Sequence, residues 1–299
     1  MSSPNIKQRL KLNTGGEIPA IGLGTWKSEP GAVEKAVSFA LENGYTHIDT
    51  ATAYGNEAEV GKGIKQSGVL RPNVFVTTKL NNPDMGKGRP EKALQNSLLQ
   101  LDLDYLDLWL MHWPAPMTED QKADKSVDWL DTWHEMERLH KEQPNKIKAI
   151  GVSNFSQEFM ERLLSNCSVV PAVNQIELHP GCSQQSLVDF CQKKGIVVFG
   201  YSPLGSDNAP LFKNPIVKEL ADKHKVSPNT ILISLQVNRP NVGVIVKSVN
   251  EDRILANLKT IQLSEEEIHA LNDMSRTEPF RVAHPRWTGW GNIGFTEAV

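Results

Sequence analysis

Four residues of this chain could together deliver a proton to a carbonyl oxygen: Asp49, Tyr54, Lys79 and His112. A phenol with an ordinary pKa of about 10 is a poor donor at neutral pH, but a nearby ammonium group stabilises the phenolate and lowers that pKa. Lys79 would be this ammonium group, and Asp49 would balance its charge, because an unpaired buried charge costs much free energy. With His112 as a second donor, the group predicts a proton-transfer site for a carbonyl that becomes an alcohol.

Each of these residues, considered alone, more often has a structural role. An aspartate at a strand end is commonly a helix cap or a turn acceptor, and a single tyrosine or histidine commonly packs in a core. Lys79 alone could lie along the surface with its ammonium group in water. The chemical interpretation therefore depends on elements that bring all four side chains to one place.

These elements can be inferred from an alternation of short apolar runs and segments with helical spacing. A turn-forming cluster at residues 13–16 predicts a β-hairpin over residues 8–20. After it, eight apolar runs rich in Val and Ile alternate with eight helical segments, and a further helix is expected at residues 228–237. The expected strands are 21–26, 47–50, 74–80, 106–112, 147–153, 172–178, 197–202 and 242–248, and the helices that follow them are 30–43, 57–66, 91–101, 127–141, 158–165, 186–194, 215–224 and 251–259.

Eight strand–helix units after a hairpin predict an α/β fold, a closed (β/α)8 TIM barrel, rather than a doubly wound sheet. No Pro/Gly/Ser-rich linker or charge block interrupts the alternation, so we expect a single domain over residues 1–299. The helix at 228–237 would be an extra helix before strand eight. The tail from residue 279 carries Phe280, Trp287, Trp290 and Phe295, which favours a C-terminal loop packed over the active site.

In such a barrel the working groups lie at the C-terminal ends of the strands. The second, third and fourth strands end at or near Asp49, Lys79 and His112, with Tyr54 just beyond the second. We therefore expect the four side chains to share one rim. Later strands add further polar residues to this rim: Ser153, Asn154, Gln175, Tyr201, Ser202, Lys247 and Ser248.

The composition argues against several other classes of function. A formal net charge of −3 gives no broad attraction for nucleic acid or acidic lipid. The N-terminus lacks the apolar core of a signal peptide, and no run approaches the roughly 18 apolar residues of a membrane span. Three cysteines without a C-x-x-C spacing favour a reducing compartment, and the histidines include no H-E-x-x-H metal motif. We expect a cytoplasmic protein with no metal site and no nucleic-acid or membrane partner.

A candidate phosphate site follows the eighth strand. Lys247, Ser248 and Arg253 place two cations and a hydroxyl group at the beginning of a helix, where free backbone N–H groups favour phosphate. Two solvated basic residues are a common alternative for such spacing, although the position at the barrel rim weakens it. The Gly-x-Gly at residues 22–24 does not predict a Rossmann site, because Lys27 stands where the third glycine is required.

With these residues in place, the chain resembles the aldo-keto reductases over nearly its full length. The matching blocks are ordered and specific: GLGTW at 22–26, HIDTATAYGNEAEVG at 47–61, TTKL at 77–80, LDYLDLWLMHWP at 103–114, IGVSNF at 150–155, VNQIELHP at 173–180, YSPLGS at 201–206 and VIVKSVNEDRILAN at 244–257. The resemblance implies a catalytic tetrad of Asp49, Tyr54, Lys79 and His112, and NADPH or NADP+ as the cofactor. It also implies residues that bind this cofactor. The nicotinamide carboxamide would be held by Ser153, Asn154 and Gln175, and the nicotinamide ring would stack on Tyr201. The pyrophosphate would be lined by Ser202, Leu204 and Ser206, the 2′-phosphate would be bound by Lys247, Ser248 and Arg253, and the adenine by Asn257; Thr25 and Trp26 in the first block are further cofactor-binding residues.

The resemblance also suggests a substrate pocket. Its expected residues are Trp26, Tyr54, Asn81, His112, Trp113 and Trp287, although the tail tryptophans could equally have a purely structural role. Many aldose-reductase-like members have Trp where this chain has Asn81, so we expect a wider and more polar pocket. Family members that reduce steroid carbon–carbon double bonds carry Glu at the position of His112, which favours a carbonyl reductase here.

The sequence therefore predicts NADPH-dependent, reversible reduction of an aldehyde or ketone, with Tyr54 as proton donor. The expected partner is a small carbonyl or alcohol, such as a sugar, a polyol or another small carbonyl compound, and the expected state is a monomer or weak dimer. One alternative is a nicotinamide-cofactor-binding regulatory or structural protein on the same barrel. Another is a barrel enzyme of unrelated chemistry whose phosphate site is merely similar.

Overall fold

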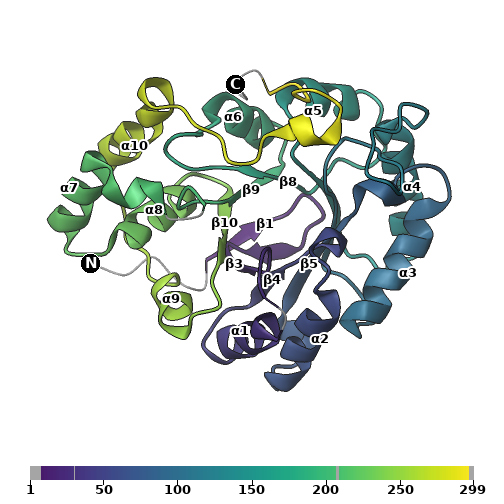
Figure 1. Cartoon of the computed structure of the whole chain (residues 1–299), viewed down its shortest axis with the longest axis horizontal. Helices are drawn as coiled ribbons and strands as arrows, with labels where there is room; N and C mark the ends of the chain where they lie inside the picture. Colours follow the sequence, from purple (N-terminus) through teal and green to yellow (C-terminus); the bar gives the residue numbers. More distant parts are fainter. Residues whose placement is uncertain (1–7, 30, 207–208, 296–299) are drawn as a thin grey trace.

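A closed barrel of parallel strands forms the centre of the molecule (Figure 1). The computed structural model describes residues 8–29, 31–206 and 209–295. Successive strands pair in chain order, and β10 closes the barrel by pairing with both β3 and β9. The predicted (β/α)8 barrel is confirmed. Its strands are β3 (Ile21–Gly24), β4 (His47–Asp49), β5 (Phe75–Leu80), β6 (Leu108–Met111), β7 (Ile150–Ser153), β8 (Val173–Glu177), β9 (Val197–Tyr201) and β10 (Val242–Lys247).

The N-terminal hairpin is also present, as the antiparallel pair β1 (Arg9–Lys11) and β2 (Glu17–Pro19). Leu10 and Ile18 face each other across the pair and are buried, so they extend the apolar core of the barrel. A shallow groove of about 350 Å³ separates the hairpin from the first residues of β5. The hairpin therefore covers the end of the barrel opposite the C-terminal strand ends.

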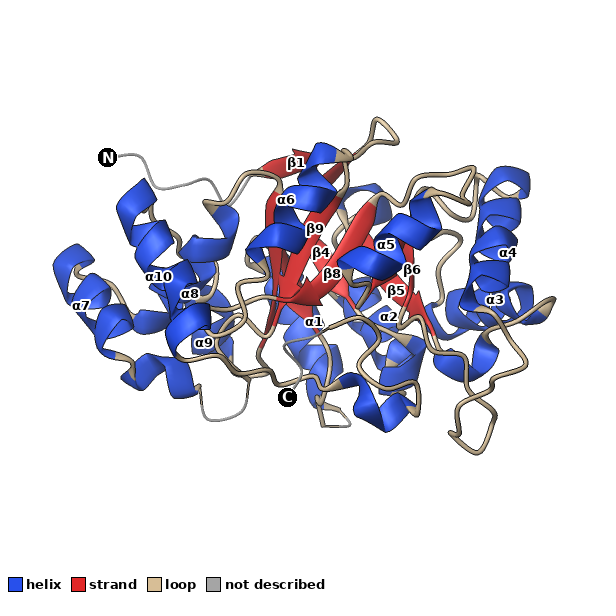
Figure 2. Cartoon of the chain, turned by 90° about the horizontal axis from the view of Figure 1, so that it is seen from above, coloured by secondary structure: helices blue, strands red, loops and turns tan. Residues whose placement is uncertain are grey.

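Helices surround the strands on all sides (Figure 2). Each places an apolar face inward; α1, for example, buries Val33, Val37 and Ala40, which is the pattern expected of a helix lying on a sheet. None of the described helices is long and apolar enough to cross a membrane. The helices are α1 (Ala32–Glu42), α2 (Glu57–Gln66), α3 (Arg89–Leu101), α4 (Trp129–Glu142), α5 (Gln157–Leu164), α6 (Gln185–Lys193), α7 (Pro215–His224), α8 (Pro228–Val237), α9 (Glu251–Ala256) and α10 (Glu265–Thr277).

Two helices separate β9 from β10, so the expected additional helix is present. α8 packs against β10, and its residues Ile233 and Val237 belong to the barrel core. α7 packs against α8 and α10 at the left of Figure 1. The additional helix is thus α7, although the sequence pattern assigned that place to residues 228–237. The reason is that α8 is buried on nearly every side, and only a helix between the barrel and a second layer can be covered in this way.

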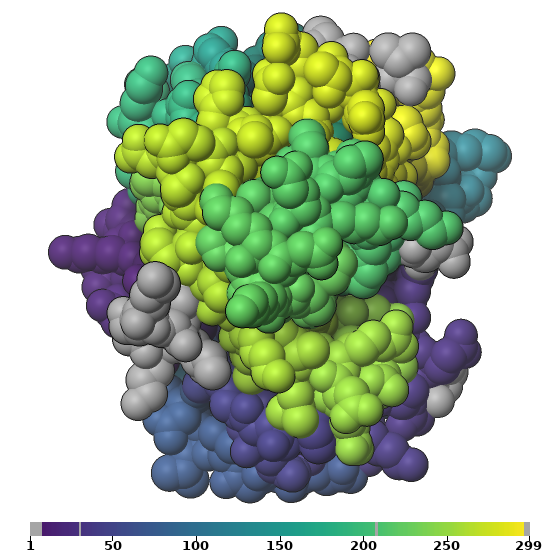
Figure 3. All heavy atoms as spheres, turned by 90° about the vertical axis from the view of Figure 1, so that its left-hand side faces the viewer, coloured from purple at the N-terminus to yellow at the C-terminus, as the bar shows by residue number. Residues whose placement is uncertain are grey.

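The sequence pattern did not predict α10. Its first turn contains a capping box, in which the Ser264 hydroxyl accepts the Glu267 N–H and the Glu267 carboxylate accepts the Ser264 N–H. Leu271 and Met274 pack into the apolar cluster that α10 shares with α7 and α8. Figure 3 shows these segments side by side on one face of the molecule. The signal in the sequence was the Ser-x-x-Glu spacing before an apolar pattern.

Candidate active site

Lys79 lies at the centre of a buried polar cluster at the C-terminal end of the barrel. Its Nζ is 2.5 Å from Asp49 Oδ1, 2.9 Å from the carbonyl oxygen of Thr50 and 3.4 Å from the Tyr54 hydroxyl. Asp49 ends β4 and Lys79 is the penultimate residue of the neighbouring strand β5, so strand pairing brings them together. Tyr54 comes from the short 3-10 turn η1 (Thr52–Tyr54) between β4 and α2. The ammonium group therefore has a carboxylate on one side and a phenol on the other.

His112 completes this cluster from the next strand. It directly follows β6, and its ring centroid is 5.7 Å from that of Tyr54, with the two planes at 75°. Its backbone N–H donates to the Leu80 carbonyl, which ties the residue to the end of β5. Its Nδ1 is buried and has no partner among the described residues. The four residues expected to act together thus lie on one rim.

The charge states of Lys79 and His112 follow from their surroundings. Burial by itself would lower the pKa of Lys79, but Asp49 and then Tyr54 outweigh it and raise that pKa above the ordinary value. Burial, followed by repulsion from Lys79, lowers the pKa of His112 well below its ordinary value. At neutral pH the cluster therefore holds an ammonium group beside a neutral imidazole.

The expected lowering of the Tyr54 pKa is wrong for the chain by itself. Burial is the largest effect and raises the pKa of Tyr54, while Lys79 pulls in the opposite direction and Asp49 raises it further. Burial outweighs Lys79 because much of the ammonium charge is already balanced by Asp49 at 2.5 Å. In this state Tyr54 is a protonated phenol that touches an ammonium group, so it still carries a proton to give.

Asp49 has a second partner that the sequence did not predict. Gln175 on β8 donates its side-chain amide to Asp49 Oδ2 at 2.6 Å. A hydrogen-bonded chain continues from Gln175 along the rim: its carbonyl accepts from Ser153 Oγ at 2.8 Å, the Asn154 amide donates to Ser153 Oγ, and Tyr201 donates to Asn154 Oδ1 at 2.7 Å. The residues expected to contact the nicotinamide carboxamide and the nicotinamide ring are thus joined to the tetrad by a chain of hydrogen bonds.

A second buried acid, Glu57, lies behind the tetrad. Its carboxylate accepts from Thr78 Oγ1 at 2.6 Å and from Ser97 Oγ at 3.2 Å, and Ser97 also contacts Thr52 in the turn that carries Tyr54. Burial raises the pKa of Glu57, and its hydroxyl partners only partly offset this. From the sequence pattern, Glu57 is expected only as the first residue of a helix.

The expected phosphate residues lie apart from this buried cluster. Lys247 and Arg253 are exposed, and among the described residues no carboxylate forms a salt bridge with either. Lys247 Nζ donates to the carbonyl of Lys27 at 3.0 Å. The Ser248 hydroxyl is buried and bonded to the backbone of Asn250, whose own side chain caps α9. Asn257, at the end of α9, is buried and accepts from the Asn229 side chain.

The remaining expected cofactor residues lie on loops between these two regions. Thr25 is buried and donates to Thr50 Oγ1 at 2.9 Å, whereas Trp26 is 44% exposed. The loop after β9 carries Ser202 and Ser206, both with left-handed φ angles of 54° and 68°. Leu204, between them, packs against the two main apolar clusters.

Aromatic residues cover the rim beside His112. Trp113 is buried and meets Trp287 edge to face at 5.9 Å between ring centroids, and Trp287 itself is 54% exposed. Trp290 donates its indole N–H to the carbonyl of Pro116 at 2.8 Å. Asn81 is half-buried, and its side-chain oxygen accepts the N–H of Asn82, so its amide nitrogen is the part left to face a ligand. The C-terminal segment thus lies against the loop that follows β6.

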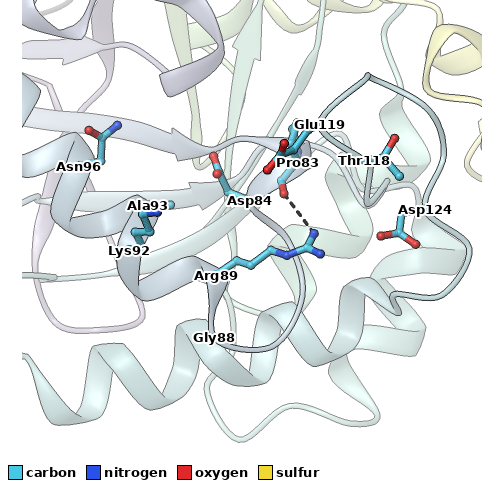
Figure 4. A pocket seen from close by; sticks show the side chains of 10 residues that line it. All are labelled: Pro83, Asp84, Gly88, Arg89, Lys92, Ala93, Asn96, Thr118, Glu119 and Asp124. Atoms are coloured by element: carbon cyan, nitrogen blue, oxygen red, sulfur yellow. Dashed lines mark hydrogen bonds between the residues drawn. The ribbon is translucent and has the colours of Figure 1, made fainter.

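A groove of about 520 Å³ lies outside this rim, between the start of α3 and the loop after β6 (Figure 4). Acids and bases are mixed in its lining: Asp84, Glu119 and Asp124 face Arg89 and Lys92. None of the four tetrad residues lines it. Across the part of the chain that the structure describes, no group of three or more His, Cys, Asp or Glu side chains is arranged to hold a metal ion.

Comparison with known proteins finds relatives that match nearly the whole chain. Residues 20–276 match the family model described as "Aldo/keto reductase family". The chain is 46% identical over 300 residues to glycerol 2-dehydrogenase (NADP(+)) of Saccharomyces cerevisiae, covering 93% of this chain and 95% of the relative. It is 46% identical over 286 residues to D-galacturonate reductase of Hypocrea jecorina, with coverage of 90% and 91%. The crystal structure of a Bombyx mori aldo-keto reductase in complex with NADP superimposes with a TM-score of 0.89 at 36% identity, covering 96% of this chain and 98% of that one.

Proposed function

Because this chain belongs to the aldo/keto reductase family, we propose that it catalyses the NADPH-dependent reduction of an aldehyde or ketone to the alcohol. One observation carries the proposal: a buried ammonium group, Lys79, lies between the Asp49 carboxylate and the Tyr54 hydroxyl. A purely structural barrel has no need of such a group, since a buried ion pair usually stabilises a fold no better than apolar packing.

In the proposed reaction the substrate oxygen lies between Tyr54 and His112, which donate hydrogen bonds to it. NADPH, when bound, supplies the hydride to the carbonyl carbon. As negative charge develops on the oxygen, Tyr54 transfers its proton to it, and Lys79 stabilises the phenolate that remains. His112 is neutral, because burial lowers its pKa, so it orients and binds the oxygen rather than protonating it. Asp49 keeps Lys79 charged and in place.

Residues along the rim support NADPH as the cofactor. The polar chain through Ser153, Asn154 and Gln175 reaches from the tetrad to Tyr201, and its amides suit a carboxamide. The exposed Arg253 has no carboxylate partner among the described residues, and it suits the 2′-phosphate that distinguishes NADPH from NADH. The relatives named for NADP and bound to NADP support the same assignment.

The proposed substrates are small carbonyl compounds that carry hydroxyl groups, such as those derived from sugars and polyols. Two relatives are named for a polyol and for a sugar acid. Asn81 adds a polar amide just after β5, and Trp113 and Trp287 add apolar surface beside His112. A pocket with one polar and one apolar side suits a short, partly hydroxylated chain.

The proposal is tested by following NADPH consumption with a panel of aldehydes, ketones and hydroxylated carbonyl compounds. A Tyr54→Phe variant should lose about 100- to 10,000-fold in kcat, because it keeps the ring and removes the proton. Its affinity for NADPH, measured by the shift in Tm on binding, should stay near that of the wild type. Wild-type turnover that survives the substitution would disprove the role of Tyr54. Tight NADPH binding without turnover of any carbonyl would favour the cofactor-binding regulatory or structural alternative.

A further inference from the structure

The C-terminal segment, residues 279–295, runs along one side of the barrel rim between two attachment points. It leaves α10, passes the end of β8 and ends beside the start of α5, as the yellow trace in Figure 1 shows. At the far end, Ile293 packs with Trp113 and Ala115. The near end is attached at Glu177, the last residue of β8 and a residue that the proposed chemistry does not use.

Glu177 binds this segment through both of its carboxylate oxygens. Oε1 accepts the backbone N–H of Val282 and Oε2 accepts that of Ala283, each at 2.7 Å. The His179 ring holds the same carboxylate through Nε2, at 2.8 Å from Oε1. Glu177 and His179 are both fully buried. We call these four residues the Glu177 clasp.

Packing beside the clasp also holds the C-terminal segment in place. The His179 ring stacks on Phe280 with 4.3 Å between centroids, and the Phe280 N–H donates to the carbonyl of Gly181. A Cβ added at Gly181 would lie 2.3 Å from the Phe280 ring, so this contact requires the absence of a side chain. The clasp therefore holds the first residues of the segment at a defined distance from β8.

The position of the pocket wall depends on this attachment. Trp287 lies four residues after Ala283, and its ring contacts that of Trp113, which follows His112 in the chain. Trp287 is 54% exposed, so the surroundings of its own ring hold it only on one side. Release of the clasp would let the chain before Trp287 shift, while the contact between Lys79 on β5 and Asp49 on β4 would stay.

We propose that Glu177 is a positioning residue for substrate recognition: its carboxylate fixes residues 280–283 and thereby the Trp287 wall of the pocket. Glu177 pairs with Tyr201 on β9, so the KM for NADPH is the readout that separates a role at the C-terminal segment from one at the cofactor. The inference rests on the proposed function, because it assigns the Trp287 side of the rim to the substrate.

The chain offers a matched control in Glu137 on α4. Glu137 is also buried, and it accepts two consecutive backbone N–H groups, those of Ser168 and Val169, as well as the Trp133 indole N–H. All three of these bonds go to Oε1, and Oε2 accepts the Ser168 hydroxyl, so both carboxylates are fully bonded but divide their backbone contacts differently. Glu137, however, holds the loop between α5 and β8, away from the rim. Substitution of Glu137 therefore reports on the loss of a buried carboxylate away from the rim.

The experiment compares Glu177→Gln with Glu137→Gln. Gln keeps one acceptor oxygen and places an NH2 group against the other backbone N–H, so one bond is lost and one repulsion is added. In Glu177→Gln, KM for a bulky aromatic aldehyde should rise about 10-fold or more, while kcat and KM for NADPH change less than about 2-fold. A three-carbon aldehyde too short to reach Trp287 should show little change. Glu137→Gln can keep the three Oε1 bonds with its amide oxygen and donate its NH2 group to the Ser168 hydroxyl, so it should leave every KM unchanged.

A second readout needs no enzymatic activity. Amide hydrogen exchange, followed by mass spectrometry on peptides covering residues 280–290, should accelerate in Glu177→Gln and stay at the wild-type rate in Glu137→Gln. Gly181→Ala, which keeps Glu177 and pushes Phe280 away, should give the same exchange and the same KM pattern if Glu177→Gln does not fold.

The inference and the proposed function can fail separately. Accelerated exchange without any carbonyl turnover would support the clasp and refute the reductase. An unchanged aldehyde KM in a folded, active Glu177→Gln would refute the positioning role, as would an equal rise in KM for NADPH. An equal rise in aldehyde KM in Glu137→Gln would refute it too, because the effect would then come from folding alone.

Discussion

Two charged regions of this barrel differ in how their charges are balanced. At the rim, Lys79 is fully buried and in contact with Asp49 and Tyr54. At the start of α9, Lys247 and Arg253 are exposed, and no carboxylate among the described residues forms a salt bridge with them. In the first region the positive charge is balanced by a carboxylate of the protein, whereas in the second it is left to water or to an anion.

The difference shows that one fold can hold its catalytic charges and its cofactor-binding charges in different environments. Buried charges interact strongly because little solvent screens them, so the tetrad can stabilise a developing charge without reorganisation. Exposed charges are screened, and they contribute to binding mainly when an anion of matching geometry arrives. Substitutions at the rim should therefore affect kcat and stability, and substitutions at α9 should affect only cofactor binding.

The largest expected effect is that of Lys79→Met. Removing the ammonium group leaves the buried Asp49 carboxylate with Gln175 as its one remaining side-chain partner in the described part of the chain, which should cost about 3–5 kcal/mol in the free energy of unfolding. Loss of phenolate stabilisation should lower kcat by about 100- to 1,000-fold. Urea unfolding and single-turnover kinetics measure the two effects.

The matched control for this substitution is Lys247→Met at the exposed region. It should leave the free energy of unfolding within about 0.5 kcal/mol of the wild type, as surface substitutions usually do. Equal destabilisation by the two variants would show that burial does not separate the regions as described.

An intermediate effect is expected for Arg253→Ala. Charge-assisted hydrogen bonds contribute about 1.5–3 kcal/mol, so the Kd for NADPH should rise about 10- to 150-fold. The Kd for NADH should barely change, since NADH lacks the 2′-phosphate. Titration calorimetry with both cofactors gives the comparison, and Lys259→Ala, at an exposed lysine just after α9, is the control. Equal weakening of both cofactors would place the 2′-phosphate elsewhere.

The smallest expected effect is that of salt. The Debye length falls from about 30 Å at 0.01 M to about 3 Å at 1 M ionic strength. KM for NADPH should rise several-fold over this range in the wild type and much less in Arg253→Ala, because the screened contact is already absent. The chemical step measured at saturating NADPH should change less than about 2-fold, since the tetrad is buried. A kcat that falls in parallel with NADPH affinity would contradict the separation.

Much of the fold was predictable from local patterns. The Val- and Ile-rich runs mark strands covered on both faces, and residues at or next to their ends, such as Asp49 and Lys79, are polar where a buried strand should be apolar. The barrel follows from the number of alternations. The helix α10 was not predicted, because its apolar residues are few and its strongest signal is the capping box at Ser264 and Glu267.

Other features depend on distances that no local pattern contains. The Gln175–Asp49 bond joins residues 126 positions apart, and the Glu177–Val282 bond joins residues 105 positions apart. The sequence predicts Gln175 at the rim but not its bond to Asp49, and it assigns no role to Glu177. Only the closed barrel brings β8 opposite β4 and carries the C-terminal segment back over β8.

The sequence by itself determined which groups are available: an acid, a phenol, an ammonium and an imidazole at consecutive strand ends, and two cations after the last strand. It did so because side-chain type and strand period are local properties of the chain. The tertiary structure decided how these groups behave. It raises the pKa of Tyr54 where the sequence led us to expect a lower one, because desolvation and charge balance depend on everything that surrounds a group in space.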